Sequence, residues 1–250
     1  HRDLHSFPTR RSSDLALVFG GILLAAAYGH GYSRGMAGQA TAACWLNLLA
    51  AGMAVVVAAD HALAFLVGWE IMSFAALFLV LRDHDQAEVR RAGLIYLMAA
   101  QVGVVCLLAA FQILAQGTGG DLSFAALAGA TLSPAARHLV FGLALAGFGA
   151  KAGLVPLHVW LPEAHPAAPS HVSALMSGVM VKTGVYGLLR VLWLLGAPAP
   201  SWAWTLLGIS VVYRRRGFVP FAGKVSRAAV PGDCRVRRFP QWRRYARKLC

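Results

Sequence analysis

The sequence predicts an all-α polytopic membrane protein. Of its 250 residues, 58% are hydrophobic and only 13% are charged, and the mean hydropathy is +0.60, which is too apolar for an ordinary soluble domain. Its apolar residues gather in long runs, and about 20 helical residues suffice to cross the hydrocarbon core of a membrane. Strict apolar–polar alternation is absent, and no glycine-rich phosphate loop follows a strand-like run, which argues against nucleotide-binding α/β folds.

Seven apolar runs are candidates for transmembrane helices. They cover residues 16–28, 40–59, 61–81, 92–116, 139–160, 171–195 and 201–212. The first and the last are too short to span a membrane, so we expect them to be incomplete. Between the fourth and fifth runs, residues 117–138 predict an amphipathic surface helix that Asp121 caps.

The formal net charge of +13 is unevenly distributed, because residues 213–250 carry 12 Lys and Arg against the single acid Asp233. Elsewhere the short connections on one side carry Arg34, Arg82, Arg90 and Arg91, and the other side carries Arg137 and Arg190. An excess of basic residues marks cytoplasmic loops, so this bias places the first side in the cytoplasm. We expect residues 82–91, which also hold Asp83, Asp85 and Glu88, to form a solvated loop without a catalytic role.

Both ends of the chain look foreign to the membrane region. Residues 6–15 match the translation of a common short-read sequencing adapter, so we interpret residues 1–15 as an artefact rather than a basic leader. Residues 213–250 are rich in Arg, Pro and Gly and lack helical periodicity, as expected of a frameshift product. A genuine polybasic tail for anionic lipid or nucleic acid is the alternative. The predicted transmembrane domain is therefore 16–212.

Three ionisable residues lie near the middle of predicted spans, namely Glu70, Lys151 and Lys182. Charge at this depth is costly, so such residues are functional candidates. We expect Glu70 to pair with Lys151 and Lys182 to be the next proton-holding group. Burial disfavours a charged lysine and a nearby carboxylate favours it, so moving or neutralising Glu70 would switch a lysine between holding and releasing a proton. A static buried ion pair is the alternative.

The segment around Lys151 predicts a broken helix. Gly149 and Gly153 flank the lysine, and Pro156 follows. Small residues at this spacing allow close helix approach, and Gly153 with Pro156 favours a break whose freed carbonyls line a hydrated cavity. A proline kink with no transport role is the other interpretation.

Three histidines follow the predicted break, at His158, His165 and His171. Histidine carries protons near neutral pH, although a loop histidine is often simply solvated. Eleven residues separate His171 from Lys182, so both are expected on one helix face about 16 Å apart, with Ser177 available as a bridge. No zinc site is expected from these spacings, and the four cysteines, Cys44, Cys106, Cys234 and Cys250, show no paired spacing that would predict a disulfide.

Two stretches carry a family resemblance. Residues 148–165, Phe-Gly-Ala-Lys-Ala-Gly-Leu-Val-Pro-Leu-His-Val-Trp-Leu-Pro-Glu-Ala-His, and residues 181–187, Val-Lys-Thr-Gly-Val-Tyr-Gly, resemble the antiporter-like proton-pumping subunits of respiratory complex I. Residues 165–180 are most similar to the branch that contains component B of hydrogenase-4 and its formate hydrogenlyase counterpart. The resemblance covers about residues 16–212.

This resemblance implies a bundle with two inverted helical repeats, each with a broken helix and its lysine. It assigns Glu70 as the partner of the pump lysine, Lys151 as that lysine and Lys182 as the connecting lysine. The chain holds most of the first repeat, so we expect a fragment of a longer subunit.

The family also implies an environment for the chain. We expect other membrane-arm subunits and a peripheral redox arm as partners, in the plasma membrane of a bacterium or archaeon, and no nucleic acid. The chain itself is expected to bind no cofactor, whereas its partners would hold Ni-Fe and Fe-S centres, or FMN and quinone in a complex of the NADH-quinone oxidoreductase type. A subunit of a multi-subunit Na⁺/H⁺ antiporter is the alternative in the transporter class. A structural or nucleic-acid-binding role depends on the basic tail alone.

Overall fold

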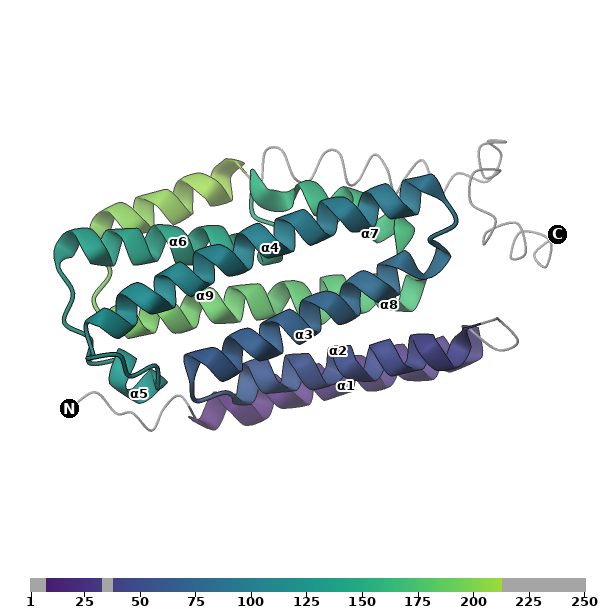
Figure 1. Ribbon diagram of the computed structural model, residues 1–250, viewed down its shortest axis with the longest axis horizontal. Coiled ribbons are helices and arrows are strands. Elements are labelled where there is room, and N and C mark those ends of the chain that lie inside the picture. Colours follow the sequence, from purple (N-terminus) through teal and green to yellow (C-terminus); the bar gives the residue numbers. More distant parts are fainter. Residues whose placement is uncertain (1–7, 33–37, 213–250) are drawn as a thin grey trace. The chain divides into compact units, whose positions relative to one another are not determined.

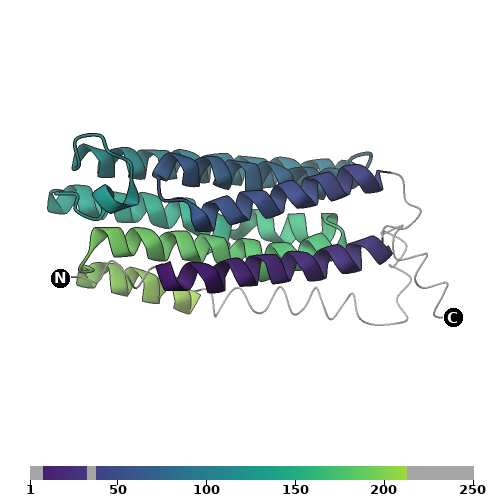
Figure 2. The same cartoon turned by 90° about the horizontal axis from the view of Figure 1, so that it is seen from below.

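The computed structural model describes residues 8–32 and 38–212, and its described residues up to Trp204 form a bundle of helices that run side by side in alternating directions (Figures 1 and 2). Its α-helices are α1 (Pro8–Tyr32), α2 (Gln39–Ala58), α3 (Ala62–Val80), α4 (Ala87–Gln116), α5 (Phe124–Leu127), α6 (Pro134–Ala152), α7 (Leu161–Ala167), α8 (Ser170–Leu175) and α9 (Val181–Leu195). Six stretches of the described residues are long and apolar enough to cross a membrane. The all-α polytopic membrane class is therefore confirmed.

The predicted inner spans correspond to helices of the structure, with bounds that differ by at most one residue for three of them and by up to eight for the fourth and fifth runs, but the first run is longer than expected. A candidate span covers Ser12–Gly31, and α1 continues into the adapter-like residues, whose origin stays a prediction. Residues 1–7, the segment 33–37 with Arg34, and the basic tail 213–250 lie outside the described residues. The last predicted run is the short apolar helix Pro200–Val212.

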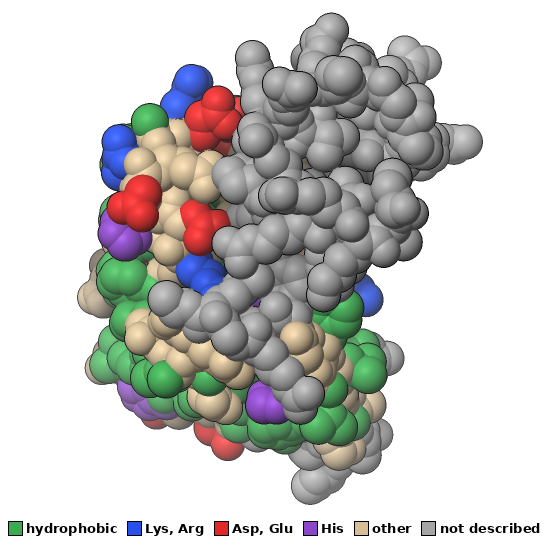
Figure 3. Space-filling view, turned by 90° about the vertical axis from the view of Figure 1, so that its right-hand side faces the viewer, with side chains coloured by type: hydrophobic (Ala, Val, Ile, Leu, Met, Phe, Trp, Pro, Cys, Tyr) green, Lys and Arg blue, Asp and Glu red, His purple; other side chains and the backbone are tan. Residues whose placement is uncertain are grey.

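The charged segment between α3 and α4 is only partly a loop. Glu88, Arg90 and Arg91 lie in the first turns of α4, so the expectation of a loop over all of residues 82–91 is wrong. The Arg90 guanidinium donates to the carbonyl oxygens of His84 and Asp85, each at 2.8 Å, which holds the connection against the start of α4. Charged side chains of both signs gather at this end of the bundle (Figure 3).

The predicted surface helix between the fourth and fifth spans is reduced to the single turn α5. Ser123, rather than Asp121, is its N-cap, because the Ser123 side chain accepts a backbone hydrogen bond from the first turn. The Asp121 carboxylate instead accepts from the Ser123 N–H at 2.8 Å, and this bond holds the pKa of Asp121 below its usual range. Phe124 and Leu127 are buried, so this turn is anchored to the bundle.

Two arginines tie helix ends together at the opposite end of the bundle from the α3–α4 connection. Arg190 is buried, donates to the carbonyl oxygen of Ala59 at 2.6 Å, and lies 3.7 Å from the ring centre of Phe124. Arg137 donates to the carbonyl oxygens of Leu195 and Ala197 at 2.6 and 3.0 Å. Carbonyls at the C-terminal end of a helix lack intrahelical partners, so these two arginines have a structural task.

Glycines let the inner helices approach closely. A Cβ on Gly52 of α2 would lie 2.6 Å from the backbone nitrogen of Met72 in α3, and a Cβ on Gly184 of α9 would lie 2.8 Å from the backbone nitrogen of Ala152 in α6. Without a side chain in the way, backbones approach and gain dispersion contacts that lipid cannot replace. Close packing of α2 on α3 and of α9 on α6 follows.

The predicted helix break is confirmed. Helix α6 ends at Ala152, and Gly153 adopts the left-handed conformation with φ 70°, which favours glycine. The Leu154 N–H donates to the carbonyl oxygen of Gly149 at 2.8 Å and the Gly153 N–H to that of Ala150 at 3.4 Å, which closes the helix end as a Schellman motif. After Pro156 the chain continues as the 3₁₀ turn Leu157–Trp160 and then as α7.

A tryptophan side chain hydrogen-bonds the segment after the break to the end of α6. The indole N–H of Trp160 donates to the carbonyl oxygen of Ala150 at 2.6 Å, and the side chain is 1% exposed. The break frees carbonyls from the helical ladder, so this bond satisfies one of them. The indole thereby fixes the geometry of the break beside Lys151.

Replacing Gly52 with Ala is expected to lower stability by about 1–3 kcal/mol, because the new Cβ forces α2 away from the α3 backbone. Thermal unfolding of the detergent-solubilised protein would measure the loss. Gly142→Ala is the matched control, since nothing lies within 4 Å of a Cβ at that helical position. Equal unfolding temperatures for the two variants would contradict the packing argument.

Replacing Trp160 with Phe is expected to lower stability by about 1 kcal/mol, because the Ala150 carbonyl loses its short bond to the indole and keeps only the 3.4 Å bond from the Gly153 N–H, while the site stays aromatic. The same thermal assay measures the effect. Trp204→Phe serves as the control, because Trp204 is 71% exposed. A loss no larger than that of the control would show that the indole bond does not secure the break.

Candidate functional site

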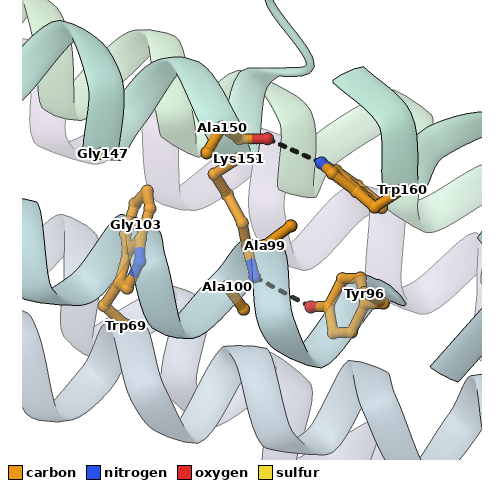
Figure 4. A pocket seen from close by; sticks show the side chains of 9 residues that line it. All are labelled: Trp69, Tyr96, Ala99, Ala100, Gly103, Gly147, Ala150, Lys151 and Trp160. Atoms are coloured by element: carbon orange, nitrogen blue, oxygen red, sulfur yellow. Dashed lines mark hydrogen bonds between the residues drawn. The ribbon is translucent and has the colours of Figure 1, made fainter. Parts of the chain in front are cut away.

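Lys151 is the centre of a buried polar site that α3, α4 and α6 build together. The side chain is 4% exposed and leaves the last turn of α6 just before the break. Its Nζ donates to Ser73 Oγ at 2.8 Å and to the Tyr96 hydroxyl at 2.9 Å. It extends toward Tyr96 with Trp69 on one side and Trp160 on the other (Figure 4). Two hydroxyls therefore hold the amine.

Aromatic rings complete the surroundings of the amine. Lys151 Nζ lies 5.1 Å from the ring centre of Tyr96 and 5.8 Å from that of Trp69. Tyr96 and Trp160 pack edge to face at 5.1 Å. An aromatic face attracts a cation, most strongly where water is excluded, so these rings compensate part of the cost of burying an ammonium.

The protons of the two hydroxyls are committed elsewhere. Ser73 Oγ donates to the carbonyl oxygen of Trp69 at 2.7 Å, and the Tyr96 hydroxyl donates to the carbonyl oxygen of Ser73 at 3.2 Å. Each hydroxyl has one proton and accepts with its lone pairs. Both oxygens are therefore acceptors toward Lys151.

Glu70 lies one turn before Ser73 on α3, but it does not form the predicted contact with Lys151. Its Oε2 accepts from the Gln101 amide at 3.2 Å, and its Oε1 is buried with no hydrogen-bond partner among the described residues. The Lys151 amine bonds Ser73 and Tyr96 instead. For this reason the described side chains of Lys151 and Glu70 form no direct ion pair.

A small cavity adjoins the amine. Its volume, counted as the space in which the centre of a water molecule fits, is about 10 Å³. One water molecule needs about this much room. Besides Lys151 and its aromatic neighbours Trp69, Tyr96 and Trp160, its lining consists of Ala99, Ala100, Gly103, Gly147 and Ala150 (Figure 4). These small side chains of α4 and α6 create the space, because larger ones would fill it.

Lys182 lies at a similar level in the bundle but points elsewhere. Its neighbour Thr183 contacts Met72 of α3, with Oγ1 3.5 Å from the sulfur, and Gly184 lies against α6. The side chain of Lys182 is nevertheless exposed on the described bundle. The structure therefore does not place it as the next group inward from Lys151.

The histidines are dispersed rather than aligned. His165 Nδ1 lies 2.7 Å from Ser173 Oγ. His171 is buried beside Gly29 of α1. Nδ1 of His158 is buried with no hydrogen-bond partner among the described residues. Neither hydrogen bond of the Lys151 amine goes to a histidine.

The expectation of a common face for His171 and Lys182 is wrong. The π-helical segment Met176–Met180 lies between them, and a π-turn holds more residues than an α-turn, so eleven residues no longer make three whole turns. His171 is buried and Lys182 is exposed. Ser177 does not bridge them, because its hydroxyl bonds to the backbone of its own helix.

Sequence reasoning missed Ser73, Tyr96 and Gln101, although each carried a signal. Ser73 follows Glu70 by three residues, which places both on one face of a helix. Tyr96 and Gln101 are polar interruptions in the apolar run 92–116. Which of these polar groups meets Lys151 depends on how three helices pack, and periodicity does not give that.

No group of three or more His, Cys, Asp or Glu side chains that could hold a metal ion occurs among the described residues. Cys44 and Cys106 are free thiols. The polar chemistry of the site therefore consists of an amine, a carboxylate, an amide and two hydroxyls.

Comparison with protein families matches residues 59–213 to the family described as NADH:quinone oxidoreductase/Mrp antiporter, transmembrane. This match includes every residue of the Lys151 site. It covers more than half of the chain.

Curated relatives are similar over the same region. Hydrogenase-4 component B of Escherichia coli strain K12 is 43% identical over 172 residues, which is 68% of this chain and 25% of the relative. An uncharacterized protein of Mycobacterium tuberculosis is 48% identical over 165 residues, 66% of this chain and 25% of the relative. NADH-quinone oxidoreductase subunit N of Geotalea uraniireducens strain Rf4 is 35% identical, over 56% of this chain and 31% of the relative. The chain spans a quarter to a third of the length of these relatives.

Solved structures share the fold. The membrane-bound sulfane sulfur reductase, an archaeal respiratory membrane complex, superposes with a TM-score of 0.67 at 24% identity, over 76% of this chain and 39% of that one. The Mrp complex from Dietzia sp. DQ12-45-1b superposes with a TM-score of 0.53 at 27% identity, over 59% of this chain and 16% of that one. Together with the family match, these similarities show that the chain belongs to the NADH:quinone oxidoreductase/Mrp antiporter family of membrane subunits.

Proposed function

We propose that this chain carries part of a proton path across the membrane, with Lys151 as its central proton-holding group. The observation that supports this most is the buried amine of Lys151, which hydrogen-bonds two neutral hydroxyls while the carboxylate of Glu70 lies a helical turn away on α3. Burying a charge at this depth costs free energy, so a residue that carries one there is a candidate for a functional role. An amine with alternative partners can gain and lose a proton, whereas a locked ion pair is a static element.

The chain's own residues divide the task. Lys151 holds and releases the proton, and Glu70 supplies the opposite charge that favours the protonated amine. The break after Ala152 leaves backbone carbonyls and a connecting segment beside the lysine, where hydration is easier than inside a continuous helix. We propose Lys182 as the next proton-holding group of the path. This role requires that another segment or water covers its side chain, which is exposed on the described bundle.

The parent assembly is proposed to be a hydrogenase-4-like or complex I-related oxidoreductase. The similarity to hydrogenase-4 component B and to NADH-quinone oxidoreductase subunit N supports this proposal. Other membrane-arm subunits would flank the chain and a peripheral arm would carry the redox centres, Ni-Fe and Fe-S or FMN and quinone. We place the assembly in the plasma membrane of a bacterium or archaeon.

The orientation follows from the charged connections. The α3–α4 connection with Arg82 and the α7 segment with His165 lie at the same end of the bundle (Figure 1). The excess of arginine there favours the cytoplasmic side. His158, His165 and His171 would then lie near the cytoplasmic end of the bundle, where we propose them as groups that take up protons for the path.

A cation/proton antiporter subunit is the second candidate. The family description names the Mrp antiporter, and the Mrp complex shares the fold. Transport assays with and without Na⁺ separate the two candidates. Proton movement that requires Na⁺ and no electron donor would favour the antiporter, and movement that requires redox turnover would favour the oxidoreductase.

Lys151→Ala is expected to lower proton transport at least about 100-fold, the scale on which loss of a positioned acid–base group acts. The measurement is dye-detected proton uptake by liposomes that contain the complete membrane complex, with assembly checked by size-exclusion chromatography. Asn47→Ala is the control, because Asn47 is an exposed polar residue of α2. Transport at the wild-type rate by an assembled Lys151→Ala complex would refute the assignment.

A further inference from the structure

Helices α3 and α4 present two polar pairs to the lysine. Glu70 of α3 bonds Gln101 of α4, and one turn along, Ser73 of α3 bonds Tyr96 of α4 through its backbone carbonyl. Residues three apart on a helix are separated by about 4.5 Å along its axis. Lys151 bonds the second pair, and in the first pair only Glu70 Oε1 is left without a hydrogen-bond partner among the described residues.

The two pairs offer the amine different chemistry. Ser73 and Tyr96, here called the hydroxyl pair, direct two neutral oxygens at Nζ, because their own protons go to backbone carbonyls. Glu70 offers a negative charge, and its Oε1 is buried without a hydrogen-bond partner among the described residues. Coulombic attraction to a carboxylate is strong at low dielectric and opposes loss of the proton. Neutral acceptors hold the amine without that attraction.

The surroundings of Nζ leave the amine some freedom to move. The lysine stem has four flexible methylenes, and the cavity of about 10 Å³ adjoins the amine. Five alanines and glycines line the cavity together with Lys151 and the rings of Trp69, Tyr96 and Trp160, so the space beside Nζ is narrow but large enough for a shift of the amine. Trp69 and Trp160 lie on the two sides of the lysine side chain (Figure 4).

We propose that Ser73 and Tyr96 are positioning residues that hold the Lys151 amine away from Glu70, so that the lysine alternates between the neutral hydroxyl pair and the carboxylate. This inference rests on the proposed proton transfer and deepens it. The hydroxyl pair is the position from which the proton leaves, and Glu70 is the position in which it is retained. Both hydroxyl protons are bound to backbone carbonyl oxygens, so neither hydroxyl passes on a proton of its own and both act through Lys151.

The test uses Tyr96→Phe and Ser73→Ala in the complete membrane complex reconstituted in liposomes, with proton uptake measured between pH 5 and 9. Loss of one hydrogen bond to a charged group is expected to lower the rate about tenfold. The pH of half-maximal transport is also expected to move, because Lys151 then stays with Glu70. Glu70 on α3 and Tyr96 on α4 are the titratable groups beside Lys151, and neither is charged differently by Ser73→Ala.

Two further variants separate positioning from packing. Ser73→Thr keeps the hydroxyl that Ser73→Ala removes, so its pH profile is expected to match that of the wild type. Tyr186→Phe makes the same chemical change on α9, where the hydroxyl donates to the carbonyl oxygen of Val57, and is expected to leave the profile in place. If Tyr96→Phe reduces assembly, Ser73→Ala and its rescue by Ser73→Thr decide the question.

The outcomes distinguish this inference from the function on which it rests. Loss of transport in Lys151→Ala with unmoved pH profiles in Tyr96→Phe and Ser73→Ala would overturn the hydroxyl pair and leave the proposed function standing. Wild-type transport in Lys151→Ala would overturn both. Moved profiles in both hydroxyl variants, with recovery in Ser73→Thr, would support the alternation.

Discussion

The cost of burying one amine governs the arrangement of the inner helices. Lys151 is 4% exposed in a span that has to lie in hydrocarbon, and an unpartnered charge there costs several kcal/mol. Two hydroxyls, two aromatic faces and a carboxylate one turn away reduce that cost without cancelling it. An incompletely compensated amine is poised to change its partner or its proton, which is the physical basis of the proposed function.

The helix break and the close contacts around it make this arrangement precise. Gly153 ends α6 in a conformation that other residues adopt with strain, and Trp160 bonds the carbonyl of Ala150 while its ring lies against Tyr96. The same indole therefore secures the break and forms a wall of the site. Gly184 brings α9 against the α6 backbone. A displacement of the break would therefore also displace α9, the helix that carries Lys182.

Several predictions from the residues held because they rest on local physics. Apolar length predicted the inner spans, and the glycines with Pro156 predicted the break. The expectation for residues 82–91 failed because charge density suggested a loop, whereas Arg90 bonds the preceding carbonyls and helix α4 starts at Ala87. The prediction that Asp121 caps the surface helix failed because two side chains compete for the same turn. Ser123 occupies the capping position of α5, while Asp121 binds the Ser123 N–H.

By itself the sequence determined the membrane class, the break and the identity of the ionisable groups, because hydropathy, backbone freedom and the cost of buried charge act along a single chain. Only the tertiary structure decided which partner each group has. Lys151 lies on Ser73 and Tyr96 rather than on Glu70, and Lys182 is turned outward after the π-helical segment Met176–Met180. The physical reason is that a hydrogen bond needs atoms within about 3 Å, and that distance depends on how separate helices are rotated and packed.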